Sequence, residues 1–166
     1  MTVDVLSRSP EETLRLGETI GRLLRGGEVL GLVGDLGAGK TCLVRGIAKG
    51  LELDPDVIYS PSFTLVAEHP GRIRLNHIDL FRLGELVSRS EAEEIGLEEY
   101  LEPQGVTVIE WTEKLGPEKM ATLPLKIEIL IQEGDRRMIR ITSGDPQGEE
   151  VLRAVAGRGK LVNPCL

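Results

Sequence analysis

Residues 34–41 read Gly34-Asp35-Leu36-Gly37-Ala38-Gly39-Lys40-Thr41. This glycine-rich loop fits the pattern G-x-x-x-x-G-K-[ST], typical of phosphate-binding loops, at every fixed position. Residues 29–33 suit a short buried strand before the loop, and apolar residues recur at helical spacing over residues 43–51. A strand, a glycine-rich loop and a helix in this order predict a cradle for a nucleoside triphosphate.

The residue types in the loop suit the chemistry of phosphate. Glycines let the backbone turn its N–H groups inward as a nest for anionic oxygens, and the start of the next helix adds its positive dipole end. We expect Lys40 to contact the β and γ phosphates and the Thr41 hydroxyl to ligate Mg²⁺. ATP and Mg²⁺ are therefore the predicted cofactors. The predicted ATP contacts in this region are Gly34, Leu36, Gly37, Ala38, Gly39, Lys40, Thr41 and Cys42.

A first helix is predicted to begin at Ser9-Pro10-Glu11-Glu12, which combines a capping serine, a proline at the first helical position and a glutamate three residues after the cap. Gly26-Gly27 ends this helix. Because the helix leads directly into the strand before the loop, Ser9 and Thr13 are candidate contacts to the adenine. The alternative is that Ser9 only caps the helix and Thr13 lies on its surface.

Composition limits the possible classes of protein. A length of 166 residues suits one domain over residues 1–166, with residues 157–166 expected to form a flexible tail. The formal net charge of −7 argues against a large nucleic-acid surface, so any RNA is expected to be held by another subunit. No apolar run approaches the roughly 20 residues that span a membrane, and residues 1–5 show neither the basic flank nor the apolar run expected of a signal peptide. We expect a cytoplasmic protein with no membrane partner, and its oligomeric state is not indicated.

The remaining segments predict further strands and helices. Pro61 favours an extended backbone around it, and a second capping box at Ser90-Glu91-Ala92-Glu93 predicts a helix that continues through Leu101. Residues 106–109 form a compact apolar run that suits a central strand. The other predicted elements are a hairpin over 64–68 and 72–79, a hairpin over 125–131 and 138–142, and a helix over 147–155. Together these elements predict an α/β, P-loop NTPase-like three-layer fold, whose central sheet is mostly parallel with antiparallel hairpin additions.

Two acidic residues follow predicted strands, and ligands of open α/β sheets collect at the carboxyl ends of strands. Glu110 follows the run 106–109, and Asp79 follows a more alternating strand. We assign Glu110 to the metal, directly or through water, together with Thr41. Asp79 is assigned to the attacking water or to the outer metal shell, although the two roles could be exchanged. Lys40, Asp79 and Glu110 form the predicted catalytic set, and the alternative for either carboxylate is a surface acid at a strand end.

Three neighbours of these carboxylates have two interpretations each. His77 could share the site or be a packed, hydrogen-bonded strand residue. Arg82 could reach phosphate or pair with a local glutamate. Trp111 could pack beside the nucleotide or belong to the core.

An ordered set of motifs now suggests a family. They are the loop 34–41 with Leu43-Val44-Arg45-Gly46, Ser60-Pro61-Ser62-Phe63-Thr64-Leu65-Val66, His77-Ile78-Asp79-Leu80-Phe81-Arg82-Leu83, Gly96-Leu97-Glu98-Glu99-Tyr100 and Ile109-Glu110-Trp111. From about Thr13 to Trp111 the sequence closely resembles the bacterial TsaE (YjeE) family. The resemblance implies a slow ATPase that acts with the TsaB–TsaD complex in making threonylcarbamoyladenosine in tRNA, and that contacts tRNA only indirectly. It also implies that residues 60–64 respond to the nucleotide state.

Three positions depart from the pattern of this family. Cys42 stands where a second threonine is usual, and a thiol is the poorer hydrogen-bond donor, so we expect a somewhat weaker nucleotide affinity. Ser62 replaces a usual threonine and keeps the hydroxyl, whereas Phe81 replaces a usual tyrosine and loses it.

Two other functions fit a glycine-rich loop of this kind. One is a small-molecule kinase, which generally carries an arginine-rich lid over the phosphates. The only clustered arginines here are in Arg136-Arg137-x-x-Arg140, around a predicted hairpin turn, so they suit a lid poorly. The other is a nucleotide-dependent assembly module that binds ATP with little turnover.

Overall fold

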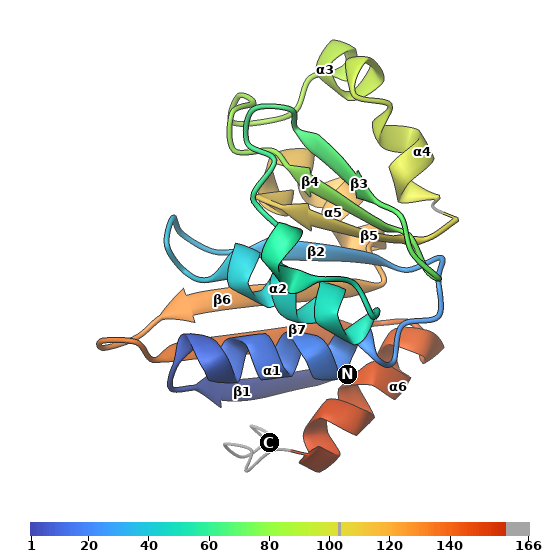
Figure 1. Cartoon of the computed structure of the whole chain (residues 1–166). Helices are drawn as coiled ribbons and strands as arrows, with labels where there is room; N and C mark the ends of the chain where they lie inside the picture. The colour runs from blue at the N-terminus through green and yellow to red at the C-terminus, as the bar shows by residue number, and fades with distance from the viewer. Residues whose placement is uncertain (103, 159–166) are drawn as a thin grey trace.

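The computed structural model describes residues 1–102 and 104–158, whose strands form one seven-stranded sheet in the order β1-β7-β6-β2-β5-β4-β3 (Figure 1). The strands are β1 (Thr2–Ser7), β2 (Val29–Val33), β3 (Val66–His69), β4 (Leu75–Asp79), β5 (Val106–Glu110), β6 (Leu125–Ile131) and β7 (Arg137–Ser143). The neighbours β6, β2, β5 and β4 are parallel, whereas β3 adds antiparallel at one edge and β7 and β1 add antiparallel at the other. The predicted α/β fold is confirmed, and both predicted hairpins are present.

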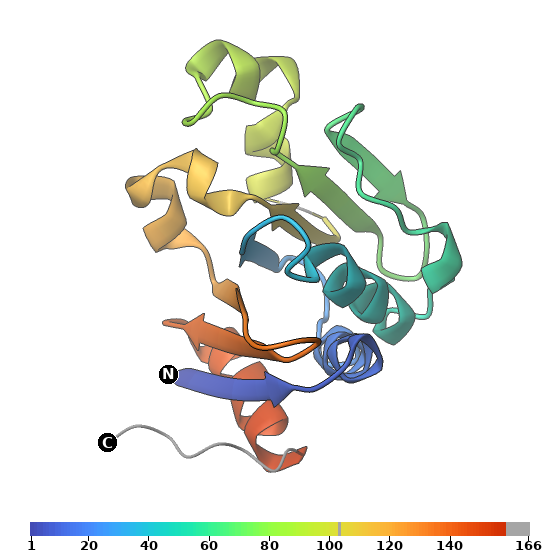
Figure 2. The ribbon, with the colours of Figure 1, turned by 90° about the vertical axis from the view of Figure 1, so that its left-hand side faces the viewer.

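Helices cover both faces of this sheet (Figure 2). The helices are α1 (Pro10–Gly21), α2 (Lys40–Gly50), α3 (Arg89–Glu94), α4 (Leu97–Leu101), α5 (Pro117–Thr122) and α6 (Pro146–Arg158), with short 3₁₀ turns η1 (Pro55–Val57) and η2 (Thr112–Leu115). Side chains alternate between the faces of a strand. Leu30 and Leu32 of β2 therefore join one buried cluster with α1 and α2, while Val29 joins a second with α4, η2 and α5. The predicted three layers follow from this alternation.

The helices α1 and α2 approach each other backbone to backbone. Each carries a pair of glycines four residues apart, Gly17 and Gly21 in α1 and Gly46 and Gly50 in α2. A Cβ atom added at Gly46 would lie 2.9 Å from the Cα atom of Gly17 and would overlap the carbonyl oxygen of Leu14. This close packing fixes α2 against α1, and thereby fixes the position of the loop that precedes α2.

The predicted helix from Ser90 through Leu101 is wrong in two respects. The helix begins earlier, because Ser88 is the N-cap and forms a reciprocal capping box with Glu91. Two serines in this segment precede a glutamate by three residues, and the first of them is used. The helix is also interrupted: Gly96 has a φ of 68°, a left-handed conformation that separates α3 from α4.

The N-terminal strand β1 is absent from the sequence-based prediction. It pairs antiparallel with β7, from Thr2 opposite Thr142 to Ser7 opposite Arg137. At the other end, α6 extends through Gly157 and Arg158, which corrects the expected start of the flexible tail, and residues 159–166 of that tail lie outside the described residues. In the part of the chain that the structure describes, no helix has the length and apolar character needed to cross a membrane.

Candidate nucleotide-binding site

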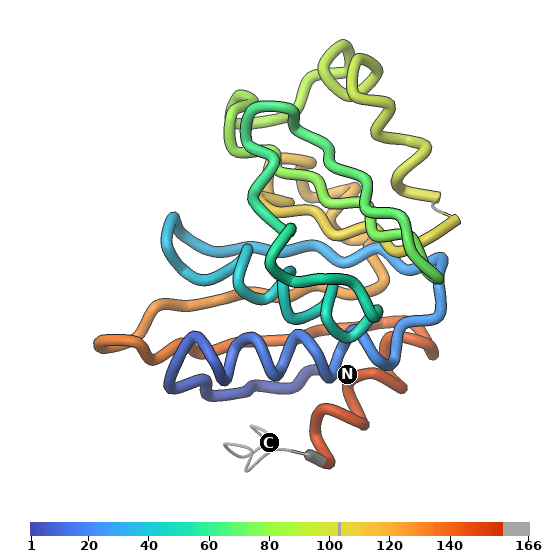
Figure 3. Tube along the Cα trace, in the orientation of Figure 1, coloured from blue at the N-terminus to red at the C-terminus, as the bar shows by residue number. Residues whose placement is uncertain are grey.

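The glycine-rich loop connects the end of β2 to the start of α2 at the edge where the parallel strands end (Figure 3). Gly37 and Gly39 have φ angles of 79° and 108°, which favour glycine because a Cβ atom is disfavoured there. Gly39 is also the N-cap of α2, and no side chain caps this helix. The N–H groups of the first turn have no partner within the helix. The loop and helix start therefore offer N–H donors and a positive dipole end to an anion.

Lys40 is held at the base of the loop. Its Nζ atom donates hydrogen bonds to the carbonyl oxygens of Gly34 and Asp35, the latter at 3.0 Å, and it lies 4.0 Å from the centroid of the Trp111 ring. Burial lowers the pKa of Lys40, and nearby carboxylates, Glu110 first among them, oppose that effect. The carbonyl groups and the aromatic face stabilise this positive charge, and a lysine cation is of the kind that binds phosphate oxygens.

Thr41, Glu110 and His77 form one hydrogen-bonded chain. The Thr41 hydroxyl donates to Oε1 of Glu110 at 2.9 Å, and the same oxygen lies 2.7 Å from Nε2 of His77. Glu110 is 3% exposed, so it is not the surface acid that was the alternative for this residue. His77 is fully buried. His77 is thus a packed, hydrogen-bonded strand residue, and through Glu110 it also contacts the candidate site, so both interpretations of this residue hold. The Nδ1 atom of His77 is buried without a hydrogen-bond partner.

Asp79 lies beside Glu110, because the two residues are directly opposite in the β4–β5 register. Its Oδ2 atom accepts a hydrogen bond from the Ser60 hydroxyl, and its Oδ1 atom accepts one from the Phe81 N–H at 2.8 Å. Asp79 is 2% exposed. The segment around Ser60 is thus tied to this carboxylate, a contact between residues 19 positions apart that sequence reasoning did not identify.

A cavity of about 430 Å³ connects these groups. Its described lining consists of Leu36, Gly37, Gly39, Lys40, Thr41, Cys42, Ser60, Ser62, Asp79, Phe81, Glu110 and Trp111. The structure therefore brings the three predicted catalytic residues and most of the predicted loop contacts to one space. Trp111 lines the cavity and packs against Phe81 at 5.1 Å between ring centroids. Ser60, Ser62 and Phe81 line the cavity but were not among the predicted site residues.

Four predicted nucleotide contacts lie outside the described lining of this cavity. Ala38 is buried, and Gly34 lies at the base of the loop, where its carbonyl group binds Lys40. Ser9 caps α1 by accepting the Glu12 N–H at 3.2 Å.

Thr13 is buried rather than on the helix surface, and its hydroxyl lies 2.8 Å from that of Ser7. The start of α1 is nevertheless close to the loop, because the Cys42 thiol donates to the Pro10 carbonyl group at 3.3 Å. Contacts from Ser9 and Thr13 to the adenine stay predictions.

Arg82 does not form the predicted pair with a local glutamate among the described residues, and its contact with phosphate stays a prediction. Its guanidinium donates to the Phe63 carbonyl group at 3.3 Å and lies 5.2 Å from the centroid of the Phe63 ring. Within residues 1–102 and 104–158 it forms no ion pair with a glutamate. Arg82 instead supports the segment that contains Ser60 and Ser62.

The donor set around Thr41 suits Mg²⁺. Among the described residues no three His, Cys, Asp or Glu side chains are grouped to hold a metal by themselves. Mg²⁺, however, usually takes one or two protein oxygens and completes its shell with phosphates and water. The Thr41 hydroxyl and the Glu110 carboxylate are such oxygens, 2.9 Å apart.

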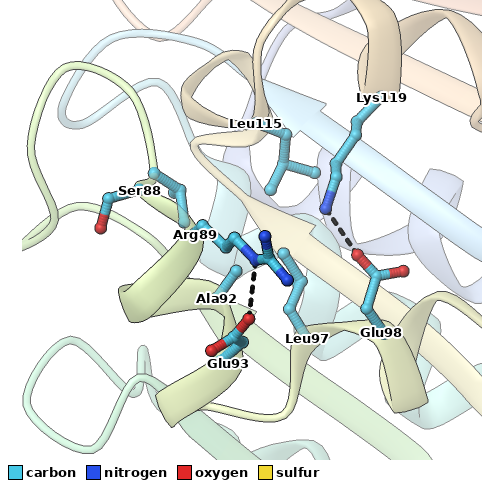
Figure 4. Close-up of a pocket in the computed structure, with 9 residues that line it drawn as sticks. Ser88, Arg89, Ala92, Glu93, Leu97, Glu98, Leu115 and Lys119 are labelled. Atoms are coloured by element: carbon cyan, nitrogen blue, oxygen red, sulfur yellow. Dashed lines mark hydrogen bonds and ion pairs between the residues drawn. The ribbon is translucent and has the colours of Figure 1, made fainter.

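A second cavity, of about 480 Å³, lies between α3–α4 and η2–α5 (Figure 4). Its charged lining residues are paired, Arg89 with Glu93 at 2.9 Å and Lys119 with Glu98 at 2.7 Å. The loop cavity instead combines Lys40 and two carboxylates with an uncapped helix N-terminus, so it is the better candidate site.

The family model of "Threonylcarbamoyl adenosine biosynthesis protein TsaE" matches residues 7–139. The chain belongs to the TsaE family. The TsaE protein of Treponema pallidum is 40% identical over 136 residues, covering 80% of this chain and 96% of that protein. TsaE of Nostoc sp. is 41% identical over 144 residues, covering 81% of this chain and 83% of that protein. Both relatives are described as tRNA threonylcarbamoyladenosine biosynthesis proteins.

A solved structure shares the fold of this chain. The crystal structure of YdiB from Bacillus subtilis superposes with a TM-score of 0.75 and is 29% identical, covering 95% of each chain. The family model and the two relatives confirm the family resemblance that the motifs indicated, and the model match extends beyond Trp111 into β6 and β7.

Proposed function

We propose that this TsaE-family chain binds ATP with Mg²⁺ in the loop cavity and hydrolyses it slowly. Hydrolysis drives or resets the TsaB–TsaD complex in the threonylcarbamoyladenosine modification of tRNA. The observation that carries this proposal is the convergence of Lys40, Thr41, Glu110 and Asp79 on one cavity beside a free helix N-terminus. A net charge of −7 disfavours direct binding to the tRNA phosphates, so the partners would hold the tRNA. The proposed location of the reaction is the cytoplasm.

Each of these residues has a role that its contacts support. The N–H groups at the start of α2 bind phosphate oxygens, and Lys40 places its charge on the β and γ phosphates. Thr41 and Glu110 would hold Mg²⁺, directly or through water, and His77 keeps Glu110 in place. Mg²⁺ when bound neutralises charge that develops on the phosphates.

Asp79 is the residue proposed to orient the attacking water. Its carboxylate lines the cavity and is fixed by Ser60 and by the Phe81 N–H. Because Ser60 lies in a segment that is neither helix nor strand, a change at the phosphates can alter this contact and the segment together. The arrangement favours Asp79 for water and Glu110 for the metal, since Glu110 is the carboxylate that contacts Thr41.

The arginine cluster argues against the kinase alternative. Arg140 pairs with Asp4 at 2.8 Å, and Arg137 binds carbonyl groups. None of Arg136, Arg137 and Arg140 is among the described residues that line the cavity, so these residues supply no lid.

A turnover assay tests the proposal and its two alternatives. ATP is supplied with Mg²⁺, with and without TsaB–TsaD, and phosphate release is measured. Stimulated release supports the ATPase, transfer to a small acceptor supports a kinase, and tight binding without release supports an assembly module.

One substitution tests the metal assignment within that assay. Glu110→Gln is expected to lower Mg²⁺-dependent turnover more than ATP affinity, whereas the exposed Glu118→Gln serves as the control for charge. Equal turnover in the two variants would contradict the role of Glu110.

A further inference from the structure

The turn between β6 and β7 lies on the same side of the molecule as the glycine-rich loop (Figure 1). Arg137, the first residue of β7, connects them. Its Nε atom donates to the Ala38 carbonyl oxygen at 3.0 Å, and its Nη2 atom contacts the Gly37 carbonyl oxygen at 3.4 Å. Its Nη1 atom donates to the carbonyl oxygens of Gly134 and Arg136 at 2.9 and 2.8 Å. One guanidinium therefore bridges two turns about 100 residues apart in the sequence.

The bond to Ala38 fixes the orientation of one peptide group in the loop. The C=O and N–H of a trans peptide point in opposite directions. When Arg137 holds the Ala38 carbonyl oxygen on one side, the N–H of Gly39 is directed to the other side. Gly39 lines the cavity and Arg137 is not among its described lining residues, so that other side is the side of the cavity.

The guanidinium of Arg137 is used to hold the glycine-rich loop and its own turn together. It forms no ion pair with any of the described carboxylates, and its four partners are all backbone carbonyl groups. The turn that presents it is itself ordered by hydrogen bonds, from the Gln132 N–H to the Arg136 carbonyl oxygen at 2.9 Å and from the Arg136 N–H to the Glu133 carbonyl oxygen at 3.3 Å. An uncompensated cation behind the loop also adds positive potential where phosphates would bind.

We propose that Arg137 is a positioning residue for nucleotide binding. It holds the glycine-rich loop from the side opposite the cavity, so that the loop N–H groups face the phosphates before ATP arrives. The β6–β7 hairpin thereby contributes to the nucleotide site as well as to the sheet. The expected effect of Arg137 on ATP affinity rests on the proposed function. Its expected effect on the order of the loop rests on the structure alone.

Arg137→Met and Arg136→Met form a matched pair for testing this role. Both remove one positive charge from the same turn, but Arg136 has an exposed side chain. The full chain is used, and the dissociation constant for ATP with Mg²⁺ is measured by calorimetry. Hydrogen exchange of the peptide covering residues 34–41 is measured without nucleotide. Arg137→Lys is a third variant, which keeps the charge and loses the planar fork of donors.

Arg137→Met is expected to weaken ATP binding about tenfold, because a hydrogen-bonded charge that orders the loop is lost. Arg136→Met is expected to stay within about twofold, with Arg137→Lys between them. Loop exchange is expected to accelerate in Arg137→Met, while exchange in α6 stays unchanged. A merely structural role of Arg137 would change the melting temperature and the exchange of all elements together.

Two results would overturn the inference. One is an ATP affinity and a loop exchange in Arg137→Met equal to those of Arg136→Met. The other is a uniform rise in exchange over the whole chain of Arg137→Met together with full rescue by lysine. A wild-type chain that binds no ATP would overturn the proposed function instead, and the loop exchange would then decide the role of Arg137.

Discussion

Replacing Gly46 by alanine tests the backbone-to-backbone packing that sets the position of α2. An added Cβ atom would lie 2.9 Å from the Gly17 Cα atom and 3.0 Å from the Glu18 nitrogen. Carbon atoms in contact prefer separations of about 3.5–4.0 Å, so the helices must separate by up to about 1 Å. The obstacles are backbone atoms, so rotation of a side chain cannot relieve the overlap.

The cost of Gly46→Ala follows from two opposing effects. Overpacking of this kind costs about 3 kcal/mol at the upper end of its range, and a gap of 1 Å weakens the other contacts between α1 and α2. Alanine recovers about 1 kcal/mol through its higher helix propensity. The net loss in free energy of unfolding is about 2 kcal/mol, which corresponds to a fall in melting temperature of about 4–8 °C for a chain of this length.

Thermal unfolding followed by circular dichroism measures this fall, and Gly157→Ala is the matched control. Gly157 is also helical, in α6, but an added Cβ atom there would meet nothing within 4 Å. Gly157→Ala should leave the melting temperature unchanged or raise it slightly. A Gly46→Ala chain as stable as the wild type would show that α1 and α2 do not pack as closely as described.

Three further predictions concern single side chains. Ser60→Ala removes the hydroxyl that anchors Asp79, so phosphate release at saturating ATP should fall several-fold with little change in ATP affinity, and unchanged release would show that Asp79 needs no anchor. Burial raises the pKa of the Cys42 thiol, so at neutral pH iodoacetamide should react with Cys42 several-fold more slowly than it reacts with the thiol of free glutathione. Mass spectrometry of the alkylated peptide measures the rate, and equal rates for the two thiols would contradict the prediction. The hydrogen bond from Arg140 lowers the pKa of Asp4 below 3.8, so the carboxylate stabilises the fold above that pH and the stabilisation is lost as pH falls through the lowered value. In urea unfolding at pH 7, Asp4→Asn should lose up to about 1 kcal/mol relative to the wild type, a difference that should shrink in acid, and a constant difference would contradict the pairing.

Local patterns in the sequence were enough to find the elements that form the site. The loop 34–41 has fixed spacings, and residues 106–109 are apolar at every position except Thr107, as a strand between two others should be. Both hairpins contain turn residues between strand-like segments. These signals lie within short stretches of sequence, so they can be recognised without knowing the fold. They placed Lys40 at the start of α2 and Glu110 at the end of β5, as the structure has them.

Contacts between distant segments could not be read in the same way. The pairing of His77 with Glu110 and the bond from Arg137 to Ala38 depend on strand order, which local periodicity does not specify. The strand β1 exists because β7 offers it an open edge. The capping of α3 by Ser88 rather than Ser90 is different, since both serines satisfy the local rule and only the packed structure distinguishes them.

The most direct test of the central claim is the affinity for ATP with Mg²⁺, measured by calorimetry on the wild type, Lys40→Ala and Lys49→Ala. Lys49 lies on the same helix but pairs with Glu18, away from the described lining of the cavity. The account predicts that the wild type and Lys49→Ala bind ATP with similar affinity and that Lys40→Ala loses most of that affinity, because its charge meets the phosphates. Equal affinity in Lys40→Ala and the wild type would contradict the account.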